Sequence, residues 1–320
     1  MLLIFSCEQD GTVDWFEKTY LAKSDLTWVR FNTEIFPERV SLSITPTNFL
    51  WSDGSTSFGP QEVRSVWFRR PAASEFKTRM RQVEKEYARN ESEKALIAMR
   101  GLLSSAIWVN WPENNLAASQ KIHQLRAAQD AGFFCPDTLV SNDPASILSF
   151  AEKHGGRLLV KPLHRGTITK SGKVRVFYST LLTWKDLSLD QRSLKVCPLI
   201  YQELVPKAFE LRVTVVNGVC FAARLDSQED PSTMVDWRRN PYKMRQTAFE
   251  LPQEIAERCL GMTQASGLLF TAFDLIVTPQ GQYVFLEHNP NGQFAWLESL
   301  TGMPIGAALL DCFRPPSARY

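Results

Sequence analysis

Several short signatures of well-known enzyme classes are missing from this sequence of 320 residues. It contains no G-x-G, which excludes the glycine-rich loops of dinucleotide-binding Rossmann domains and protein kinases, and no GxxxxGK[ST], which excludes a P-loop NTPase. Neither GxSxG nor HExxH is present. No Ser/His/Asp set stands out in the sequence either.

Net charge, paired cysteines and long apolar runs are also scarce. Lys and Arg number 36 against 34 Asp and Glu, a net charge of +2, which argues against a protein built to coat nucleic acid or an acidic membrane. The six cysteines are scattered without a CxxC, as is typical of reduced cytoplasmic thiols and not of zinc or disulfide sites. The opening MLLIFSCEQDG has no basic start and soon reaches Glu8 and Asp10, so we expect neither a signal peptide nor a membrane span.

What remains is an ordinary globular composition, 44% hydrophobic and 22% charged, with alternating strand and helix signals. Strand-like runs at 2–6 and 27–31 flank a helical stretch at 13–23, which predicts a β-α-β opening and an α/β domain. A hairpin at 40–51, a strand at 63–68 and a helix within 75–105 follow. We expect a domain boundary near 113–116.

The second section begins with a predicted helix that runs from the candidate N-caps Asn114 and Asn115 to Gly132. A helix from Asp143-Pro144 to His154 and the strand RLLVKPL come next, and 164–173 is predicted to be a mobile loop because it has no apolar pattern. From Leu199 onward the chain predicts strands, two hairpins and two helices. The expected domains are therefore 1–115, 116–195 and 196–320.

The most informative segment is TAFDLIVTPQGQYVFLEHNPNG, which predicts two strands around the turn at 279–282. A symmetric hairpin places Asp274 opposite Glu287, with Asn289 two residues along the same face. The other face then carries only apolar residues, which are Phe273, Leu275, Val277, Val284 and Leu286. Two carboxylates this close need a shared proton or a cation, and this oxygen donor set suits Mg²⁺ with substrate phosphates completing its shell. From geometry alone, an acidic hairpin face with a neighbouring salt bridge is an equally good interpretation.

A second hairpin, FELRVTVVNGVCFAARL, turns on Asn217-Gly218. Its register places Glu210 and Arg212 on one face, where a guanidinium usually has a fixed anionic partner, and a structural salt bridge is the simpler interpretation of Arg212. Arg224 lies on the opposite face in this register unless a bulge redirects it. Lys161 ends an apolar strand just before a polar loop, from where a lysine can reach phosphate; Lys121, within the helix, is by itself a solvated residue.

Six segments, in this order and spacing, resemble the ATP-grasp superfamily and, within it, the peptide maturases that make microviridin- and marinostatin-like products, the graspetide synthetases. They are SVWFRRP (65–71), AASQKIHQLRAAQDAGF (117–133), LVKPL (159–163), IYQELVPKAFELRVTVV (200–216), DWRR (236–239) and FDLIVTPQGQYVFLEHNPNGQFAWLE (273–298). The resemblance implies an α/β (α+β) ATP-grasp fold, with an N-terminal pre-ATP-grasp domain, a central domain and a C-terminal catalytic domain.

The resemblance also implies the roles of individual residues. ATP would be held between the last two domains by Lys121, Lys161, Gln202, Glu203, Leu204, Val205 and Lys207, with the hinge segment 202–205 at the adenine. The Mg²⁺ ligands would be Asp274, Glu287 and Asn289, which turns the even choice above into a preference for metal. The catalytic candidates are Arg212, which would meet the γ-phosphate or acyl phosphate, and Glu210, Arg224 and Arg238. The loop of Asp236, Trp237, Arg238 and Arg239 is a candidate for holding an acidic peptide; a surface turn with a packed tryptophan is as good an interpretation.

The implied activity is ATP-dependent macrocyclisation of a ribosomally made precursor peptide with a leader and an acidic core. A core Asp or Glu carboxylate would become an acyl phosphate, and a Ser or Thr hydroxyl or a Lys amine would close an ω-ester or ω-amide. The leader would bind near 165–180 and the central helices, and a cytoplasmic homodimer is expected. Two alternatives keep the fold: a carboxylate–amine ligase that adds an amino acid such as glutamate to a protein or small molecule, and a non-enzymatic ATP-binding protein.

Overall fold

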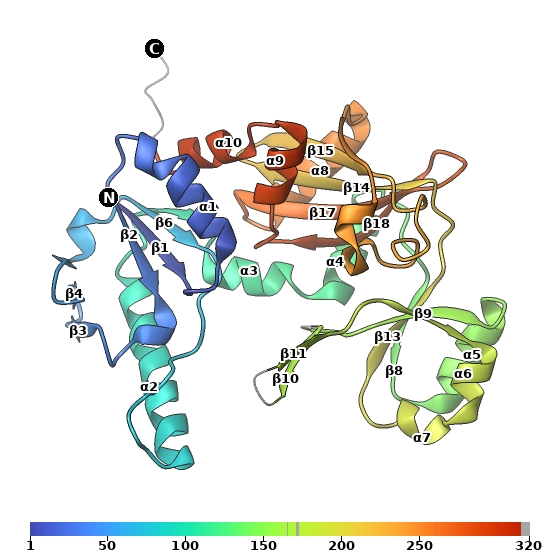
Figure 1. Cartoon of the computed structure of the whole chain (residues 1–320), viewed down its shortest axis with the longest axis horizontal. Coiled ribbons are helices and arrows are strands. Elements are labelled where there is room, and N and C mark those ends of the chain that lie inside the picture. The colour runs from blue at the N-terminus through green and yellow to red at the C-terminus, as the bar shows by residue number, and fades with distance from the viewer. Residues whose placement is uncertain (165, 171–172, 315–320) are drawn as a thin grey trace.

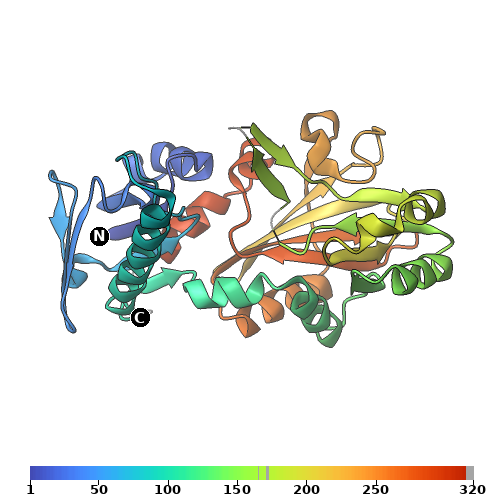
Figure 2. The ribbon, with the colours of Figure 1, turned by 90° about the horizontal axis from the view of Figure 1, so that it is seen from below.

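The computed structural model describes residues 1–164, 166–170 and 173–314. Figure 1 shows an N-terminal group of elements on one side, a five-stranded sheet on the other, and a smaller four-stranded sheet beneath it. Figure 2, seen from below, shows α3 leading from the N-terminal group to the other two. No helix in the described ranges is both long and apolar enough to cross a membrane.

The N-terminal group is an α/β unit, as predicted. Its parallel sheet has the strand order β2-β1-β6-β7. The strands are β1 (Leu2–Ser6), β2 (Trp28–Asn32), β6 (Ser65–Phe68) and β7 (Ile107–Val109). Alternate residues of β1 enter two cores: Leu2 and Ile4 pack with Phe16 of α1 (Gly11–Thr19), and Leu3 and Phe5 pack with Met99 of α2 (Gln82–Gly101). Helices therefore cover both faces of the sheet, which explains why β1 is apolar at nearly every position. The predicted hairpin at 40–51 forms β3 (Ser41–Ile44) and β4 (Phe49–Ser52), extended by β5 (Ser57–Phe58).

The single helix predicted after Asn114 and Asn115 is wrong. The structure has two helices, α3 (Pro112–Ala118) and α4 (Lys121–Asp130), and between them Gln120 adopts an extended conformation (φ −78°, ψ 101°). Asn115 lies within α3 and is buried, where it accepts a hydrogen bond from Asn110 Nδ2, so it is not an N-cap. The break places Lys121 at the first position of α4.

The smaller sheet has the order β12-β9-β13-β8. It comprises β8 (Thr138–Ser141), β9 (Arg157–Lys161), β12 (Thr180–Thr183) and β13 (Leu199–Glu203), and it is covered by α5 (Pro144–Lys153), α6 (Trp184–Leu189) and α7 (Gln191–Leu194). Asp143 caps α5 as predicted, accepting from Ser146 N. The predicted loop at 164–173 is wrong in part, since β10 (Thr167–Lys170) pairs with β11 (Lys173–Val176); residues 165 and 171–172 lie outside the described residues. The β-branched residues of TIT and VRV favour strands more than the lack of an apolar pattern suggested.

The larger sheet is antiparallel, with the order β16-β15-β14-β17-β18. Its strands are β14 (Phe209–Val216), β15 (Val219–Leu225), β16 (Gln246–Phe249), β17 (Phe270–Val277) and β18 (Tyr283–Asn289). One face carries apolar residues that pack on α4 and on α8 (Gln253–Ala265). The residues are Leu211, Val213, Val215, Phe273, Leu275 and Phe285. The other face is therefore free to carry the polar residues that alternate with them.

Two buried polar contacts join the N-terminal unit to the C-terminal sheet. Asn110, at the end of β7, accepts hydrogen bonds from Leu269 N (2.9 Å) and Phe270 N (3.0 Å) and donates to Phe270 O (2.8 Å) and Pro290 O (3.2 Å). Near α1, the Tyr20 hydroxyl donates to the carboxylate of Glu298, in α9 (Ala295–Thr301) ahead of α10 (Ile305–Cys312). These contacts fix the N-terminal unit beside the turn that follows β18.

We predict that Asn110→Ala lowers the free energy of unfolding by about 3 kcal/mol, because the buried backbone groups of β17 and Pro290 lose their partners. Urea unfolding measures the change. Asn114→Ala, which removes one exposed hydrogen bond to Gly267 O, is the matched control and should cost less than about 1 kcal/mol. Equal losses in the two variants would mean that the Asn110 contacts do not hold the units together.

Candidate active site

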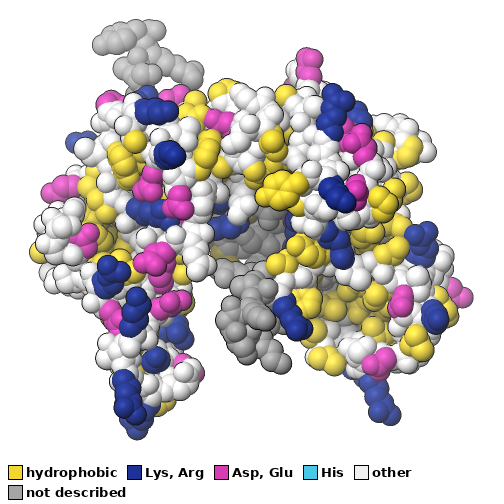
Figure 3. All heavy atoms as spheres, viewed as in Figure 1, with side chains coloured by type: hydrophobic (Ala, Val, Ile, Leu, Met, Phe, Trp, Pro, Cys, Tyr) yellow, Lys and Arg dark blue, Asp and Glu magenta, His cyan; other side chains and the backbone are white. Residues whose placement is uncertain are grey.

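A cleft of 820 Å³ lies where the three groups of elements meet. Figure 3 shows the molecule hollowed between the N-terminal group and the rest, with Lys and Arg side chains along the edge of the hollow. The cleft is lined by nearly all the residues that the sequence singled out, which are Lys121, Lys161, Gln202, Glu203, Leu204, Val205, Lys207, Glu210, Asp236, Trp237, Arg238, Asp274, Glu287 and Asn289. The fold therefore brings these distant segments into one site.

The β17–β18 hairpin forms one wall of the cleft. Asp274 pairs with Glu287 and Ala272 with Asn289, so the predicted opposition of the two carboxylates is confirmed. Only the part of the predicted register between Asp274 and the turn is wrong, because a bulge follows Asp274 and pairs Leu275 with Phe285. Phe285 therefore packs in the core, and Leu286, expected there, lines the cleft. The bulge leaves the polar side chains on one face while shifting the apolar alternation by one residue.

Cationic side chains surround the two carboxylates. Arg212, on the neighbouring strand β14, donates from Nη1 to Asp274 Oδ1 at 2.8 Å, so the salt-bridge interpretation of Arg212 is correct and its acid is Asp274. Lys121 Nζ lies 3.6 Å from Glu287 Oε2. Burial raises the pKa of Asp274 despite Arg212. Burial would also raise the pKa of Glu287, but Lys121, Arg238 and Lys161 together lower it to about 2, so Glu287 is a stable anion.

The donor set on this face suits a hard divalent cation. Asp274 and Glu287 supply two opposed carboxylates, and Asn289 follows on the same face and donates from Nδ2 to Glu287 Oε1 at 3.2 Å. Nowhere in the described residues do three or more His, Cys, Asp or Glu side chains cluster as a ready-made metal site. Two carboxylates and an amide match Mg²⁺, which keeps water and phosphate oxygens as its remaining ligands.

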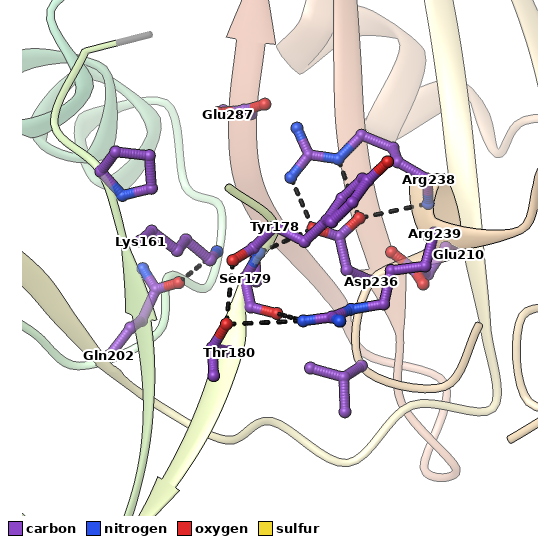
Figure 4. Close-up of polar contacts among 12 residues, drawn as sticks. Lys161, Tyr178, Ser179, Thr180, Gln202, Glu210, Asp236, Arg238, Arg239 and Glu287 are labelled. Carbon is purple, nitrogen blue, oxygen red and sulfur yellow. Dashed lines mark hydrogen bonds and ion pairs between the residues drawn. The ribbon is translucent and has the colours of Figure 1, made fainter. Parts of the chain in front are cut away.

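Two lysines face this hairpin from the smaller sheet and from α4. Lys161, at the end of β9, donates to Gln202 Oε1 at 2.7 Å (Figure 4). The amide of Gln202 is oriented by its own donation to Thr138 Oγ1. Burial lowers the pKa of Lys161 to about 8, which means that an anion arriving in the cleft would stabilise its charge. Lys121 Nζ donates to Pro162 O at 3.0 Å, so the helix break at 119–120 directs this lysine to the end of β9.

The loop that carries Asp236 closes another side of the cleft. Asp236 is buried and accepts two hydrogen bonds from the Arg238 guanidinium, at 2.8 and 2.6 Å, and one from Ser179 N (Figure 4). Arg239 donates to Ser179 O and lies over the Tyr178 ring. Trp237 packs against Trp296, as the structural interpretation of this turn expected, but the Arg238 side chain is half-exposed and lines the cleft. The loop thus presents a fixed guanidinium to the cleft.

Two of the catalytic candidates, Arg212 and Arg224, do not line the cleft. Arg212 is buried and donates to Asp274, which does line it. Arg224 lies outside the cleft: its side chain pairs with Asp226 at 2.6 Å and its guanidinium lies over the Phe209 ring, as the simple register indicated. Glu210 lines the cleft and accepts from Lys207 Nζ at 2.7 Å, and burial raises its pKa although Lys207 opposes the shift.

Sequence reasoning gave no role to Arg69, although it lies in the SVWFRRP segment. Arg69 is 1% exposed, lies 3.6 Å from the buried Asp10 and donates to Asn291 O in the turn after Asn289. It therefore connects the N-terminal unit to the turn that follows the candidate metal ligands. The sequence signal that could have indicated this role is an arginine that directly follows the apolar strand SVWF.

Gly292, in the same turn, is required for close packing. A Cβ atom there would lie 2.7 Å from Arg212 Nη2 and 2.4 Å from the Cβ of Ala272. Any side chain at this position would displace Arg212 or the turn.

Comparisons with known proteins support one family over the whole chain. Residues 1–115 match the MvdD pre-ATP grasp domain family. The macrocyclase MdnC from Microcystis aeruginosa MRC, solved with the precursor peptide MdnA, is 28% identical with a TM-score of 0.82, and the match covers 98% of both chains. A RiPP-associated ATP-grasp ligase of Chryseobacterium gregarium, solved with ADP and a leader and core peptide, is 27% identical with a TM-score of 0.86, over 98% of this chain and 97% of that one. A comparison with curated proteins finds no match.

The macrocyclase MdnB from Microcystis aeruginosa MRC is 30% identical, with a TM-score of 0.81 and 98% of each chain covered. The similarity thus extends across the pre-ATP-grasp unit, both sheets and the cleft between them. With this identity over its full length, and with this fold, the chain belongs to the graspetide synthetases, the peptide-macrocyclising branch of the ATP-grasp ligases.

Proposed function

We propose that this protein is an ATP- and Mg²⁺-dependent macrocyclase that crosslinks acidic side chains of a ribosomally made precursor peptide. The observation that carries the proposal is the Asp274–Glu287 pair, which faces Lys121 and Lys161 in a cleft of 820 Å³. The ligands of the two relatives above, a precursor peptide in one and ADP with leader and core in the other, support the same substrates here.

ATP would lie between the two sheets. Lys161 and Lys121 are positioned to contact its phosphates, and the end of β13 at 202–205, with Lys207, would hold the adenine. Asp274, Glu287 and Asn289 would hold Mg²⁺, which neutralises charge on the phosphates as the phosphoryl group moves. Glu287 is ready to bind a cation, because Lys121, Arg238 and Lys161 keep its carboxylate ionised.

The reaction has two steps. An Asp or Glu carboxylate of the peptide attacks the γ-phosphorus of ATP, which gives an acyl phosphate and ADP. A Ser or Thr hydroxyl, or a Lys amine, then attacks the acyl carbon, phosphate leaves, and an ester or amide closes the ring with net loss of one water from the peptide. Arg212 would stabilise the charge that develops on the acyl phosphate.

Two further residues would act on the peptide. Arg238, held by Asp236, presents its guanidinium to the cleft and would bind an acidic core side chain. Glu210, whose pKa is raised by burial, would accept the proton that the attacking hydroxyl or ammonium loses. We propose that the leader binds at the stretch 165–180 and at the helices α5–α7 of the central domain. We also propose that the active form is a cytoplasmic homodimer.

We expect wild-type protein, incubated with ATP, Mg²⁺ and the precursor peptide encoded beside its gene, to lower the peptide mass by one water for each ring. The double variant Asp274→Asn, Glu287→Gln should leave the mass unchanged, because it lacks the charge that holds the cation. Intact-mass spectrometry is the measurement. Asp130→Asn, Glu254→Gln removes two exposed carboxylates far from the cleft and should keep full activity.

The same experiment separates the proposal from its alternative. A gain of amino-acid residue masses would identify a carboxylate–amine ligase with another acceptor. An unchanged peptide with the wild-type protein, although ATP binds, would contradict macrocyclisation of that peptide.

We predict that Arg212→Lys lowers kcat by about 100-fold, because a point charge on a shorter side chain cannot reproduce the donors that Arg212 directs at Asp274 and the site. Arg224→Lys makes the same exchange at an arginine that pairs with Asp226 and not with the carboxylate hairpin, and should change kcat less than about twofold. Steady-state kinetics of ADP release measure both. An equal loss in Arg224→Lys would show that Arg224 is part of the catalytic machinery.

A further inference from the structure

A second cavity, of 290 Å³, lies within the N-terminal unit on the α2 side of the parallel sheet. Its floor is formed by Phe5 and Phe68, at the carboxyl ends of β1 and β6, and one wall by the segment from Pro71 to Ser74. The opposite wall is the inward face of α2, including Leu96, Ile97 and Arg100. No step of the proposed mechanism uses this cavity.

The strand order places the cavity where α/β sheets commonly bind ligands. In the order β2-β1-β6-β7 the chain passes from β1 to β2 on one side and then crosses to β6 on the other. The crossing leaves a crevice at the carboxyl ends of β1 and β6, and such switch points are the usual ligand sites of open α/β sheets. Phe5 and Phe68 occupy these two strand ends.

The lining combines apolar walls with an arginine, Arg100, on which Glu113 and Glu93 act through space without forming an ion pair. The Arg100 guanidinium lies over the Phe68 ring at 5.1 Å from its centroid. Within the described part of the chain, no carboxylate forms an ion pair with Arg100. Arg89, by contrast, is engaged, since its Nε donates to Ser74 O at 3.1 Å. An apolar pocket with one convergent guanidinium suits a carboxylate on a short aliphatic stem.

The cavity adjoins the main cleft. Phe68, Pro71 and Ala72 line both, and Arg69 and Arg70, on the intervening strand end, line the cleft. Arg69 is buried and lies beside Asp10, so a chain that leaves the cleft over Pro71 passes one exposed arginine, Arg70, before it reaches Arg100. Glu93 is the one acidic residue lining the cavity, so the path as a whole is basic.

We propose that this cavity, which we call the α2 pocket, is a second subsite for the precursor peptide. It binds an Asp or Glu side chain of the core that is not the one being activated, with the carboxylate on Arg100 and the stem against Phe68. The proposal rests on the macrocyclase function proposed above. It commits to the core as the occupant because the pocket shares three lining residues with the reaction cleft and its charge is complementary to an acidic segment.

The first test compares Arg100→Gln with Lys94→Gln, which removes a charge from an exposed position on the same helix. Loss of a charged hydrogen bond should raise the KM for the precursor peptide about tenfold in Arg100→Gln. The KM for ATP and kcat at saturating peptide should change less than twofold, and Lys94→Gln should match wild type. An unchanged peptide KM in Arg100→Gln would overturn the proposal.

A second pair of variants leaves Arg100 in place. Ile97→Trp fills the α2 pocket from its wall, whereas Val83→Trp puts the same ring on α2 away from the pocket. Both positions are exposed, 38% and 64%, so both variants should fold. We expect Ile97→Trp alone to raise the peptide KM; equal values for the two variants would contradict the subsite.

A panel of precursor peptides, each with one core Asp or Glu changed to Asn or Gln, identifies the occupant. One peptide should show a raised KM with wild type and no further rise with Arg100→Gln, because both changes remove the same contact. If Arg100→Gln raises the KM of every variant peptide as much as it raises the KM of the unchanged peptide, no core carboxylate binds Arg100. If the effect of Arg100→Gln disappears when the leader is deleted, the leader occupies the pocket and the proposal is wrong.

These outcomes are distinct from failure of the proposed function. Wild-type protein that crosslinks no peptide contradicts the macrocyclase proposal itself. Wild-type protein that crosslinks the peptide, with Arg100→Gln and Ile97→Trp indistinguishable from it, contradicts only the α2 pocket.

Discussion

Two carboxylates on one face of a buried hairpin dictate much of this structure. Asp274 and Glu287 oppose each other where water is scarce, so each needs a cation close by. The fold supplies these cations from separate parts of the chain: Arg212 from the neighbouring strand, Lys121 from the start of α4, and Arg238 from the loop after β15. The arrangement that stabilises the two carboxylates therefore also gathers positive groups at the cleft.

The N-terminal unit takes part in this arrangement through backbone contacts. Asn110 binds the residues at the start of β17 and also Pro290 after β18, so it holds both chain ends of the carboxylate hairpin, and Arg69 binds Asn291 in the turn after it. Neither side chain has to touch a substrate to matter. Because the contacts are buried and specific, small displacements of the N-terminal unit are transmitted to the turn that follows Asn289.

How much the sequence could predict depended on how local each signal was. The Asn217-Gly218 turn and the opposition of Asp274 and Glu287 follow from alternation and turn chemistry, and both are in the structure. The bulge after Asp274 and the helix break at 119–120 were missed, because each is decided by packing between distant elements. Arg69 and the α2 pocket were missed for the same reason. Their partners lie hundreds of residues away or on three separate segments, and no local pattern encodes such contacts.

The contact chain from Asp10 through Arg69 to Asn291 has a practical consequence for exchanging parts between relatives. Consider a chimera whose first 115 residues come from another synthetase. Its residue at the position of Arg69 then comes from that synthetase, and the turn after β18 must fit that residue. Residues 1–115 are therefore not a unit that can be exchanged alone. The transferable unit is the N-terminal part together with the 289–292 turn, and recombination designs that cut only at the linker would separate two surfaces that must match.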